Sequence, residues 1–221
     1  MCMEKMYFLG GENILKRDAR EINEIAFRNA EGAPRVVVIP WARSSFDKAY
    51  KRRKRLFDYF RSLGASTIDF AEYSDSFEEI AAKVACSDLV YLPGGLTSVL
   101  VERLKNKSID SLLRRYDKVL VGRSAGALAL CKKCLITYRN KRAIKIIPGL
   151  GLVDLTIKVH YKPSKDSELK RLSKEETIYA IPESSALVSD NGATSFIGDV
   201  YLFQNGEKTH CDCASNVSSS G

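Results

Sequence analysis

The stretch VLVGRSAGALAL, residues 119–130, sets an apolar run directly against a Gly-x-Ser-x-Gly turn and an alanine- and leucine-rich segment. A sharp turn from a buried strand into a helix lifts a serine hydroxyl above the carboxyl edge of a sheet. The first amides and the dipole of the helix then face an oxyanion that develops on a substrate. Ser124 is therefore a candidate nucleophile, the alternative being a serine that merely caps a helix after a tight turn.

Short β-branched runs alternate with helical patterns through about residue 134. The predicted strands are Met6–Leu9, Val36–Ile39, Thr67–Phe70, Leu89–Leu92 and Lys118–Val121. The predicted helices are Asn13–Asn29, Phe46–Leu63, Phe77–Ala85, Ser98–Lys105 and Ser108–Tyr116. Strands that alternate with helices predict βαβ units, and hence an α/β fold with a mostly parallel central sheet and helices on both faces.

The last third of the chain has a different pattern, because short strand-like runs follow one another with turn signals such as DNG and GD between them. The predicted strands are Ala143–Ile147, Leu155–Val159, Thr177–Ile181, Ala186–Ser189, Ala193–Ile197 and Val200–Phe203. We expect a strand-rich C-terminal extension, either antiparallel in the same sheet or a small layer over it. A single domain of residues 1–210 and a disordered polar tail, 211–221, are predicted.

Composition and cysteine spacing bear on the cellular compartment and on the state of the cysteines. No apolar stretch of the 221 residues is long enough to cross a bilayer, and the first residues lack a signal-peptide pattern, so we expect a cytoplasmic protein. The six cysteines are then expected as free thiols. Cys131 and Cys134 fall in a predicted helix and Cys211 and Cys213 in the tail, a spacing that disfavours structural zinc.

The net charge of +8 has its densest source in residues 48–64, KAYKRRKRLFDYFRSLG, which read as an amphipathic helix with a basic outer face. A solvated face is the favoured interpretation, with nucleic-acid binding through Lys48–Arg55 as the alternative. No zinc-finger, RRM or KH pattern accompanies the basic run. We therefore expect neither nucleic acid nor membrane as a partner.

Other candidate site residues also follow predicted strands. The turn Pro93-Gly94-Gly95 follows Leu89–Leu92, so the N–H groups of Gly95 and Ala125 are candidates for an oxyanion hole. The chain contains two histidines, and His160 ends the alternating run LTIKVHY whereas His210 lies beside the tail. His160 is thus the favoured general base. Glu183 and Asp154 both stay open as the acid that orients it.

The ordered series of motifs resembles the serine peptidases of the aspartyl dipeptidase (dipeptidase E) and cyanophycinase family over about residues 5–208. The matching segments are FLGGEN, VVVIPWA, SDLVYLPGGLTSVL, VLVGRSAGALAL, PGLGLVDLTIKVHY and YAIPESSALVSDNGATSFIGDVYLFQNGE. The resemblance implies a flavodoxin-like, three-layer α/β sandwich of the class I glutamine amidotransferase type.

The resemblance also implies roles for individual residues. Ser124 is the nucleophile, His160 the general base and Glu183 the orienting acid, with the oxyanion amides at Gly95 and Ala125. An acid that follows the histidine argues against an α/β-hydrolase, where it precedes the histidine. Serine in place of cysteine at the elbow disfavours glutamine hydrolysis.

Two departures from the family pattern concern the substrate. Leu96 stands where the family often has asparagine, and the stretch after His160 keeps Arg171 while lacking a further expected arginine. Since arginine suits a substrate carboxylate, a strict preference for N-terminal aspartate is in doubt. Arg123, Lys162 and Arg171 are the candidate substrate-binding cations.

Together these observations predict a serine peptidase that acts on short peptides, with an acidic N-terminal or isopeptide-linked residue as a candidate substrate feature. The implied chemistry passes through an acyl-enzyme and requires no metal or organic cofactor. An esterase or amidase with the same site, or a catalytically silent binding module, are the alternatives. Either a monomer or a homodimer is compatible with the sequence.

Overall fold

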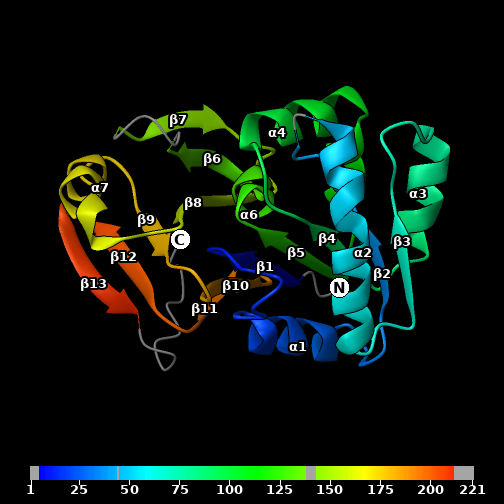
Figure 1. Cartoon of the computed structure of the whole chain (residues 1–221). Helices are drawn as coiled ribbons and strands as arrows, with labels where there is room; N and C mark the ends of the chain where they lie inside the picture. Colours follow the sequence, from blue (N-terminus) through cyan, green and yellow to red (C-terminus); the bar gives the residue numbers. More distant parts are fainter. Residues whose placement is uncertain (1–4, 44, 138–142, 212–221) are drawn as a thin grey trace.

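A seven-stranded sheet forms the centre of the computed structural model, which describes residues 5–43, 45–137 and 143–211 (Figure 1). In spatial order its strands are β11 (Ala193–Ile197), β10 (Ala186–Asp190), β1 (Lys5–Leu9), β5 (Val119–Arg123), β4 (Leu89–Leu92), β2 (Arg35–Val38) and β3 (Thr67–Phe70). The strands from β1 to β3 in this order are parallel, and β10 and β11 continue the sheet antiparallel beyond β1. The predicted parallel core is therefore present, and the last hairpin extends it.

Helices cover both faces of this sheet, which confirms the three-layer α/β arrangement. On one face α1 (Arg20–Asn29) and α2 (Phe46–Ser62) pack on Tyr7 and Leu9 of β1. On the other face Met6 and Phe8 contribute to a core shared with α3 (Phe77–Ala85), α4 (Thr97–Asn106), α5 (Ile109–Leu113) and α6 (Ala125–Leu130). Because both faces are buried, the parallel strands read as continuous apolar runs.

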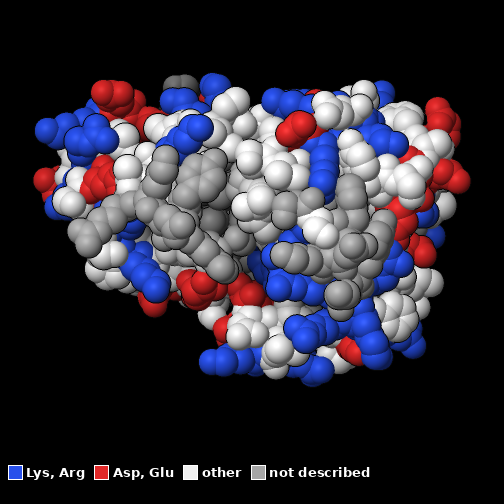
Figure 2. All heavy atoms as spheres, turned by 45° about the horizontal axis from the view of Figure 1, so that its top comes forward, with Lys and Arg blue, Asp and Glu red and all other residues white. Residues whose placement is uncertain are grey.

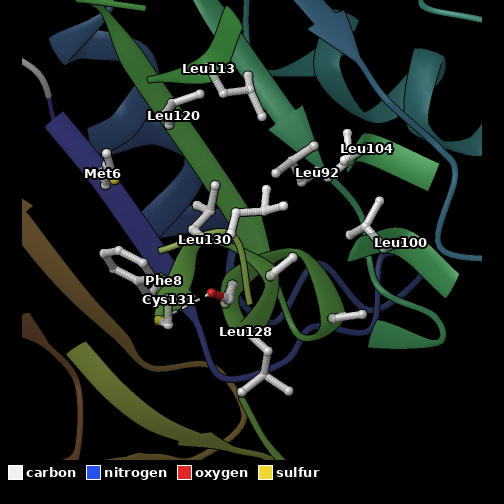
Figure 3. Close-up of a cluster of buried hydrophobic side chains, with 14 of the residues drawn as sticks. Met6, Phe8, Leu92, Leu100, Leu104, Leu113, Leu120, Leu128, Leu130 and Cys131 are labelled. Carbon is white, nitrogen blue, oxygen red and sulfur yellow. Dashed lines mark hydrogen bonds between the residues drawn. The ribbon is translucent and has the colours of Figure 1, made fainter. Parts of the chain in front are cut away.

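The core beneath α6 joins the two halves of the chain (Figure 3). Leu128 and Leu130 from α6 lie in the same cluster as Phe8 of β1 and Leu120 of β5. The cluster continues into the second half of the chain through buried residues such as Ile157. Every residue of the helix that follows Ser124 is therefore buried.

A second sheet contains the remaining strands of the described chain. In spatial order they are β13 (Glu207–Cys211), β12 (Val200–Gln204), β9 (Ile178–Ile181), β8 (Val153–Val159), β6 (Cys131–Ile136) and β7 (Lys145–Pro148). One face joins the core under α6, and the other packs through Ile178 and Phe203 on α7 (Asp166–Leu172), which follows a short 3-10 turn, η1 (Pro163–Lys165). The strand-rich C-terminal part therefore divides between an extension of the central sheet and a sheet of its own.

The expectation that Cys131 and Cys134 lie in a helix is wrong. Helix α6 ends at Leu130, and Cys131 opens strand β6 with extended backbone, φ −75° and ψ 164°. The ALAL run is helical, but pairing of β6 with β8, a contact distant in sequence, keeps the helix from continuing into Cys131–Cys134. Both thiols are buried, and burial raises the pKa of Cys134 to about 12.

Cys211 and Cys213, the other two cysteines considered for a zinc site, do not both lie in the described fold. Cys211 is buried at the end of β13, one residue beyond the predicted domain boundary, and Cys213 lies outside the described residues. Within the described ranges, no three His, Cys, Asp or Glu side chains are close enough together to hold a metal ion. The tail 212–221 also lies outside the described residues. No helix in the described part of the chain is long and apolar enough to span a membrane, and the cytoplasmic location stays a prediction.

Helix α1 begins at Arg20, later than the predicted start at Asn13. The N–H of Leu15 donates to the Asn13 side chain at 3.1 Å, and the N–H of Asn13 donates to Asp18 at 2.8 Å. Such local side-chain bonds compete with helix formation, and Arg17 has a positive φ of 55°. Residues 13–18 consequently form a turn region at the carboxyl edge of the central sheet, instead of the first turns of a helix.

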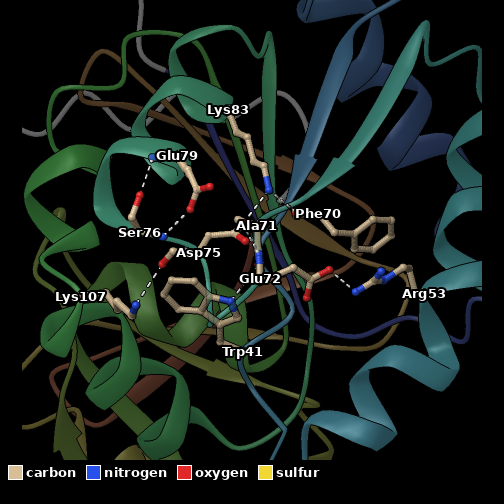
Figure 4. A network of polar contacts seen from close by, with 10 residues as sticks. All are labelled: Trp41, Arg53, Phe70, Ala71, Glu72, Asp75, Ser76, Glu79, Lys83 and Lys107. Carbon is tan, nitrogen blue, oxygen red and sulfur yellow. Dashed lines mark hydrogen bonds and ion pairs between the residues drawn. The ribbon is translucent and has the colours of Figure 1, made fainter.

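The loop between β3 and α3 is held by a polar network (Figure 4). Ser76 and Glu79 form a capping box at the start of α3, which explains why this helix begins at the predicted residue. Lys83 pairs with Asp75 at 2.6 Å. Arg53 of α2 pairs with Glu72, so the network also fixes α2 against this loop.

Asp88 ties three adjacent parallel strands together at the end of the sheet opposite Ser124. Its carboxylate accepts from the N–H and guanidinium of Arg35 at 3.0 Å and from Lys118 at 3.0 Å. These hydrogen bonds, that from Arg35 above all, hold the pKa of Asp88 well below its usual range. The ionised form is thereby favoured in the folded chain.

We predict that Asp88→Asn lowers the free energy of unfolding by about 1–3 kcal/mol at pH 7, since the substitution removes a charged acceptor from a half-buried site. A carboxylate with a lowered pKa stabilises the fold above its unfolded pKa of about 3.9 and loses this contribution as the pH falls further. The difference between wild type and variant should shrink below about pH 4 in urea titrations. Asp58→Asn, which removes an exposed pair with Lys54, is the control and should change little. If the difference in unfolding free energy between wild type and Asp88→Asn did not change with pH, the ionised Asp88 carboxylate would not be its source.

Candidate active site

Ser124 occupies a strained turn between β5 and α6. Its φ of 54° and ψ of −108° lie outside the regions that a serine normally adopts, as a nucleophile elbow requires. A Cβ at Gly126 would lie 2.0 Å from the Leu92 carbonyl oxygen, so α6 approaches β4 more closely than any side chain permits. The small residues after Ser124 therefore allow the turn that projects the hydroxyl from the sheet edge.

His160 lies within hydrogen-bonding distance of the serine hydroxyl. The distance from Ser124 Oγ to His160 Nε2 is 2.6 Å. His160 directly follows β8 and has a positive φ of 51°. The second sheet thus supplies the histidine, and the central sheet supplies the serine.

Glu183 completes the chain of hydrogen bonds. Its Oε1 lies 2.5 Å from His160 Nδ1. Glu183 stands between β9 and β10, and the next residue, Ser184, again has a positive φ, of 58°. The carboxylate is placed to orient the imidazole and to stabilise an imidazolium.

Three consecutive carbonyl groups at the end of β1 hold the three segments that bear these side chains. The Leu9 carbonyl accepts from the N–H of Ser124 at 3.0 Å, and the Gly10 carbonyl accepts from the N–H of His160 at 3.0 Å. The Gly11 carbonyl accepts from the N–H of Ser184 at 3.1 Å. One short backbone segment therefore sets the relative positions of serine, histidine and glutamate.

The other candidates for these roles lie elsewhere. His210 faces Asp199 at 3.1 Å on the second sheet. Asp154 pairs with Lys132 at 3.2 Å and its side chain is 83% exposed. Of the alternatives that the residues alone left open, the structure places Glu183 at His160.

Gly95 and Ala125, the candidate oxyanion-hole residues, both lie near Ser124. Gly95 follows the end of β4 and lines the same cavity as Ser124, and Ala125 is the first residue of α6. Among the described residues no acceptor is found for either N–H group. Unpaired amides at a helix start next to a nucleophile are the donors that an oxyanion hole requires.

Two cavities, each of about 450 Å³, meet at His160. We call the first the arginine cavity, because four arginines line it together with Glu12, Asp18 and Glu183. These arginines are Arg43, Arg52, Arg55 and Arg123. It thus holds charges of both signs on the Glu183 side of the site.

The second, the lysine cavity, lies on the side of Ser124. Lys158, Lys162 and Lys165 line it, and none of the described residues that line it is acidic. Its apolar lining comes from Leu96, Leu128, Leu135, Ile136 and Val159. The two cavities therefore differ in charge: mixed in one, positive and apolar in the other.

The predicted substrate-binding cations have different positions. Arg123 lines the arginine cavity and donates to the Glu12 carbonyl at 3.4 Å. Burial raises the pKa of the Glu12 carboxyl, and the charge of Arg123 opposes this shift. Lys162 lines the lysine cavity, whereas Arg171 is exposed on α7 and lines neither cavity.

Sequence reasoning missed most of the cations at the site. The basic run predicts a solvated face for Arg52 and Arg55, and in the structure they are exposed yet also line the arginine cavity. The basic run itself was the available signal, and what was lacking was the position of α2 beside the sheet edge. Figure 2 shows Lys and Arg spread over one face of the molecule, with smaller groups of Asp and Glu.

A serine on an elbow, hydrogen-bonded to a histidine that is oriented by a carboxylate, is the arrangement by which serine hydrolases perform acyl transfer. Free amides beside the serine belong to the same machinery. The fold and the site geometry together define this class of protein.

The chain belongs to peptidase family S51, whose model matches residues 8–197. A curated relative, described as an uncharacterized peptidase of Listeria monocytogenes, is 28% identical over 141 residues, which are 57% of this chain and 68% of the relative. The family predicted from the ordered motifs is thus confirmed, and the protein is a peptidase.

Solved structures share the fold. A peptidase from an acI-B1 actinobacterium superposes with a TM-score of 0.76 at 19% identity, covering 98% of this chain and 97% of that one. A Listeria monocytogenes EGD-e protein provisionally named Peptidase E gives a TM-score of 0.68 at 20% identity, with 88% and 98% covered. At these identities the likeness concerns the fold alone.

Gly10 and Gly11 offer a test of the site geometry. A Cβ at Gly11 would lie 2.0 Å from Glu183 Oε2 and 2.7 Å from His160 Cε1, and a side chain can move away from it. A Cβ at Gly10 would lie 1.9 Å from the Pro182 carbonyl oxygen, which is backbone. We predict that Gly11→Ala keeps the fold but slows labelling of Ser124 by a fluorophosphonate about 10–100-fold, because small displacements of catalytic groups are costly.

Gly10→Ala should instead lower the thermal unfolding midpoint, because backbone must shift to accommodate the methyl group. Labelling rates and thermal melts of both variants separate the two effects. Unchanged labelling of folded Gly11→Ala would show that the Glu183 position does not matter to the reactivity of Ser124.

Proposed function

We propose that the chain is a serine peptidase that hydrolyses dipeptides with an acidic N-terminal residue, with Ser124 as nucleophile. The supporting observation is the hydrogen-bonded series from Ser124 Oγ to His160 Nε2, 2.6 Å, and from His160 Nδ1 to Glu183 Oε1, 2.5 Å. Membership of peptidase family S51 supports peptide hydrolysis as the reaction class.

In the acylation step, Ser124 Oγ attacks the scissile carbonyl carbon while His160 Nε2 accepts the hydroxyl proton. The N–H groups of Gly95 and Ala125 donate to the oxyanion of the tetrahedral intermediate. Collapse of this intermediate breaks the C–N bond, and His160 gives its proton to the leaving amine. The product of this step is an ester between Ser124 and the N-terminal residue of the substrate.

In the deacylation step, water attacks the ester carbonyl while His160 accepts one of its protons. The second tetrahedral intermediate collapses, the proton returns to Ser124 Oγ, and the free acid leaves. Glu183 stabilises the imidazolium that forms in both steps.

The arginine cavity supports the preference for an acidic N-terminal residue. Arg123 adjoins Ser124 in sequence and lines this cavity with Arg52 and Arg55, so a substrate carboxylate has guanidinium partners. Glu12 and Asp18 in the same cavity offer negative charge to a substrate ammonium group. An isopeptide-linked acidic residue would present the same pair of charges.

We predict that Ser124→Ala lowers dipeptide hydrolysis at least about 10³-fold, because loss of a nucleophile removes the covalent pathway. A dipeptide library assay of wild type and variant measures this, with thermal melts to show that the variant is folded. If the wild type cleaves aryl esters and no dipeptide, the site belongs to an esterase. A folded wild type that hydrolyses neither and resists fluorophosphonate is a binding module.

The arginines have a separate test. Arg123→Gln and Arg55→Gln should each lower the preference for N-terminal aspartate over alanine by about 10–100-fold, the contribution of a charge-assisted hydrogen bond. Lys54→Gln is the matched control, because Lys54 lies on α2 beside Arg55, pairs with Asp58 and does not line the cavity. The measured quantity is the ratio of kcat/KM for the two dipeptides. Ratios equal to that of wild type in both arginine variants would rule out this cavity as the acidic subsite.

A further inference from the structure

Lys158 is a buried ammonium group that lines the same cavity as Ser124 and that the acyl-transfer chemistry does not use. It lies on β8 two residues before His160 and is 5% exposed. Its Nζ donates to the Val159 carbonyl at 2.6 Å, which occupies one of three N–H donors. In the part of the chain that the structure describes, no carboxylate lies within ion-pair distance of Nζ.

This arrangement is unfavourable in the absence of an anion. A buried charge without a counter-charge lowers the stability of the fold, because the charge has lost its hydration. Burial lowers the pKa of Lys158 to about 8; the positive charge of Lys165 acts in the same direction, and the carboxylate of Glu168 opposes it. An anionic group delivered into the cavity would offset this cost and hold the lysine in its charged form.

The lysine cavity has the lining that such a group needs. Lys162 shares it with Lys158, whereas Lys165 is already paired with Glu168 at 3.1 Å. Leu128, Leu135 and Ile136 give the same cavity an apolar wall. A ligand that fits both features carries a carboxylate and an apolar group on one small unit.

The C-terminal residue of a dipeptide is such a unit, because its α-carboxylate and its side chain share one carbon atom. Ser124 lines the same cavity, so a dipeptide whose scissile carbonyl lies at Ser124 can place this carboxylate in the cavity. The arginine cavity, with both signs of charge, suits the other residue, which carries the free ammonium.

On the basis of the proposed peptidase function, we propose that Lys158 anchors a subsite in the lysine cavity for the C-terminal carboxylate of a dipeptide whose second residue is apolar. In a longer peptide an uncharged amide would occupy this position. The subsite would therefore restrict substrates to two residues.

The test compares Asp-Leu with its C-terminal amide, Asp-Leu-NH₂. Binding is measured by calorimetry on the Ser124→Ala background, so that no turnover is needed, with and without Lys158→Met. Methionine keeps the length of the side chain and removes the buried charge, so the variant should melt no lower than its parent. Lys133→Met on the neighbouring strand β6 is the control, because Lys133 pairs with Glu176 and does not line the cavity.

We expect the free acid to bind at least about 10-fold more tightly than the amide, the effect of a charge-assisted contact. This ratio should fall to near one with Lys158→Met and stay unchanged with Lys133→Met. A ratio that Lys158→Met leaves intact, or equal binding of acid and amide to the parent, overturns the proposal.

Hydrolysis of the two peptides by the wild type separates this result from the proposed function. A wild type that cleaves both forms equally, with a ratio insensitive to Lys158→Met, keeps the peptidase and loses the subsite. A wild type that cleaves neither form while the binding ratio depends on Lys158 keeps the carboxylate subsite and loses the proposed reaction. Failure to bind either form overturns the subsite as well.

Discussion

The site depends on the hydrogen bonds that three successive backbone carbonyls accept at the end of β1. Leu9, Gly10 and Gly11 receive the N–H groups of Ser124, His160 and Ser184. Backbone groups at fixed spacing along one chain segment define positions more rigidly than side-chain contacts do. The serine, the histidine and the glutamate come from distant parts of the sequence and are brought into register by this one segment.

The same segment explains how two sheets make one site. Strand β1 lies inside the central sheet beside β5, which is followed by Ser124. The carbonyls of Gly10 and Gly11, directly after β1, bind the residue after β8 and the turn after β9. The residues that these bonds hold, Ser124, His160 and Ser184, each have a positive φ. Strained backbone persists where the surroundings over-determine it, and here the surroundings also orient the reacting side chains.

Much of the fold could be predicted from sequence because its signals are local. Strand β4 and helix α3 match their predicted bounds, the latter because a capping box marks its start. Ser124 and His160 followed from the elbow pattern and from the scarcity of histidine. Strand β6 could not be predicted, because it follows the helical pattern of residues 125–130 without a break. The strand forms by pairing with β8, which is distant in sequence. Among the cations of the two cavities, Arg123 and Lys162 could be predicted because they lie close in sequence to Ser124 and His160. Arg52, Arg55 and Lys158 could not, since α2 and β8 meet the site only in three dimensions.

The central claim is that Ser124 forms a covalent intermediate held by this geometry, and pre-steady-state kinetics with an aspartyl nitrophenyl ester test it most directly. If Ser124 is acylated, nitrophenolate appears in a rapid burst approaching one equivalent per chain, followed by slower turnover, provided that deacylation is the slower step. Peptide mapping of the quenched reaction should place the added mass on Ser124, and Ser124→Ala should show neither burst nor adduct. Undiminished turnover by Ser124→Ala, or an adduct on another residue, would contradict the account.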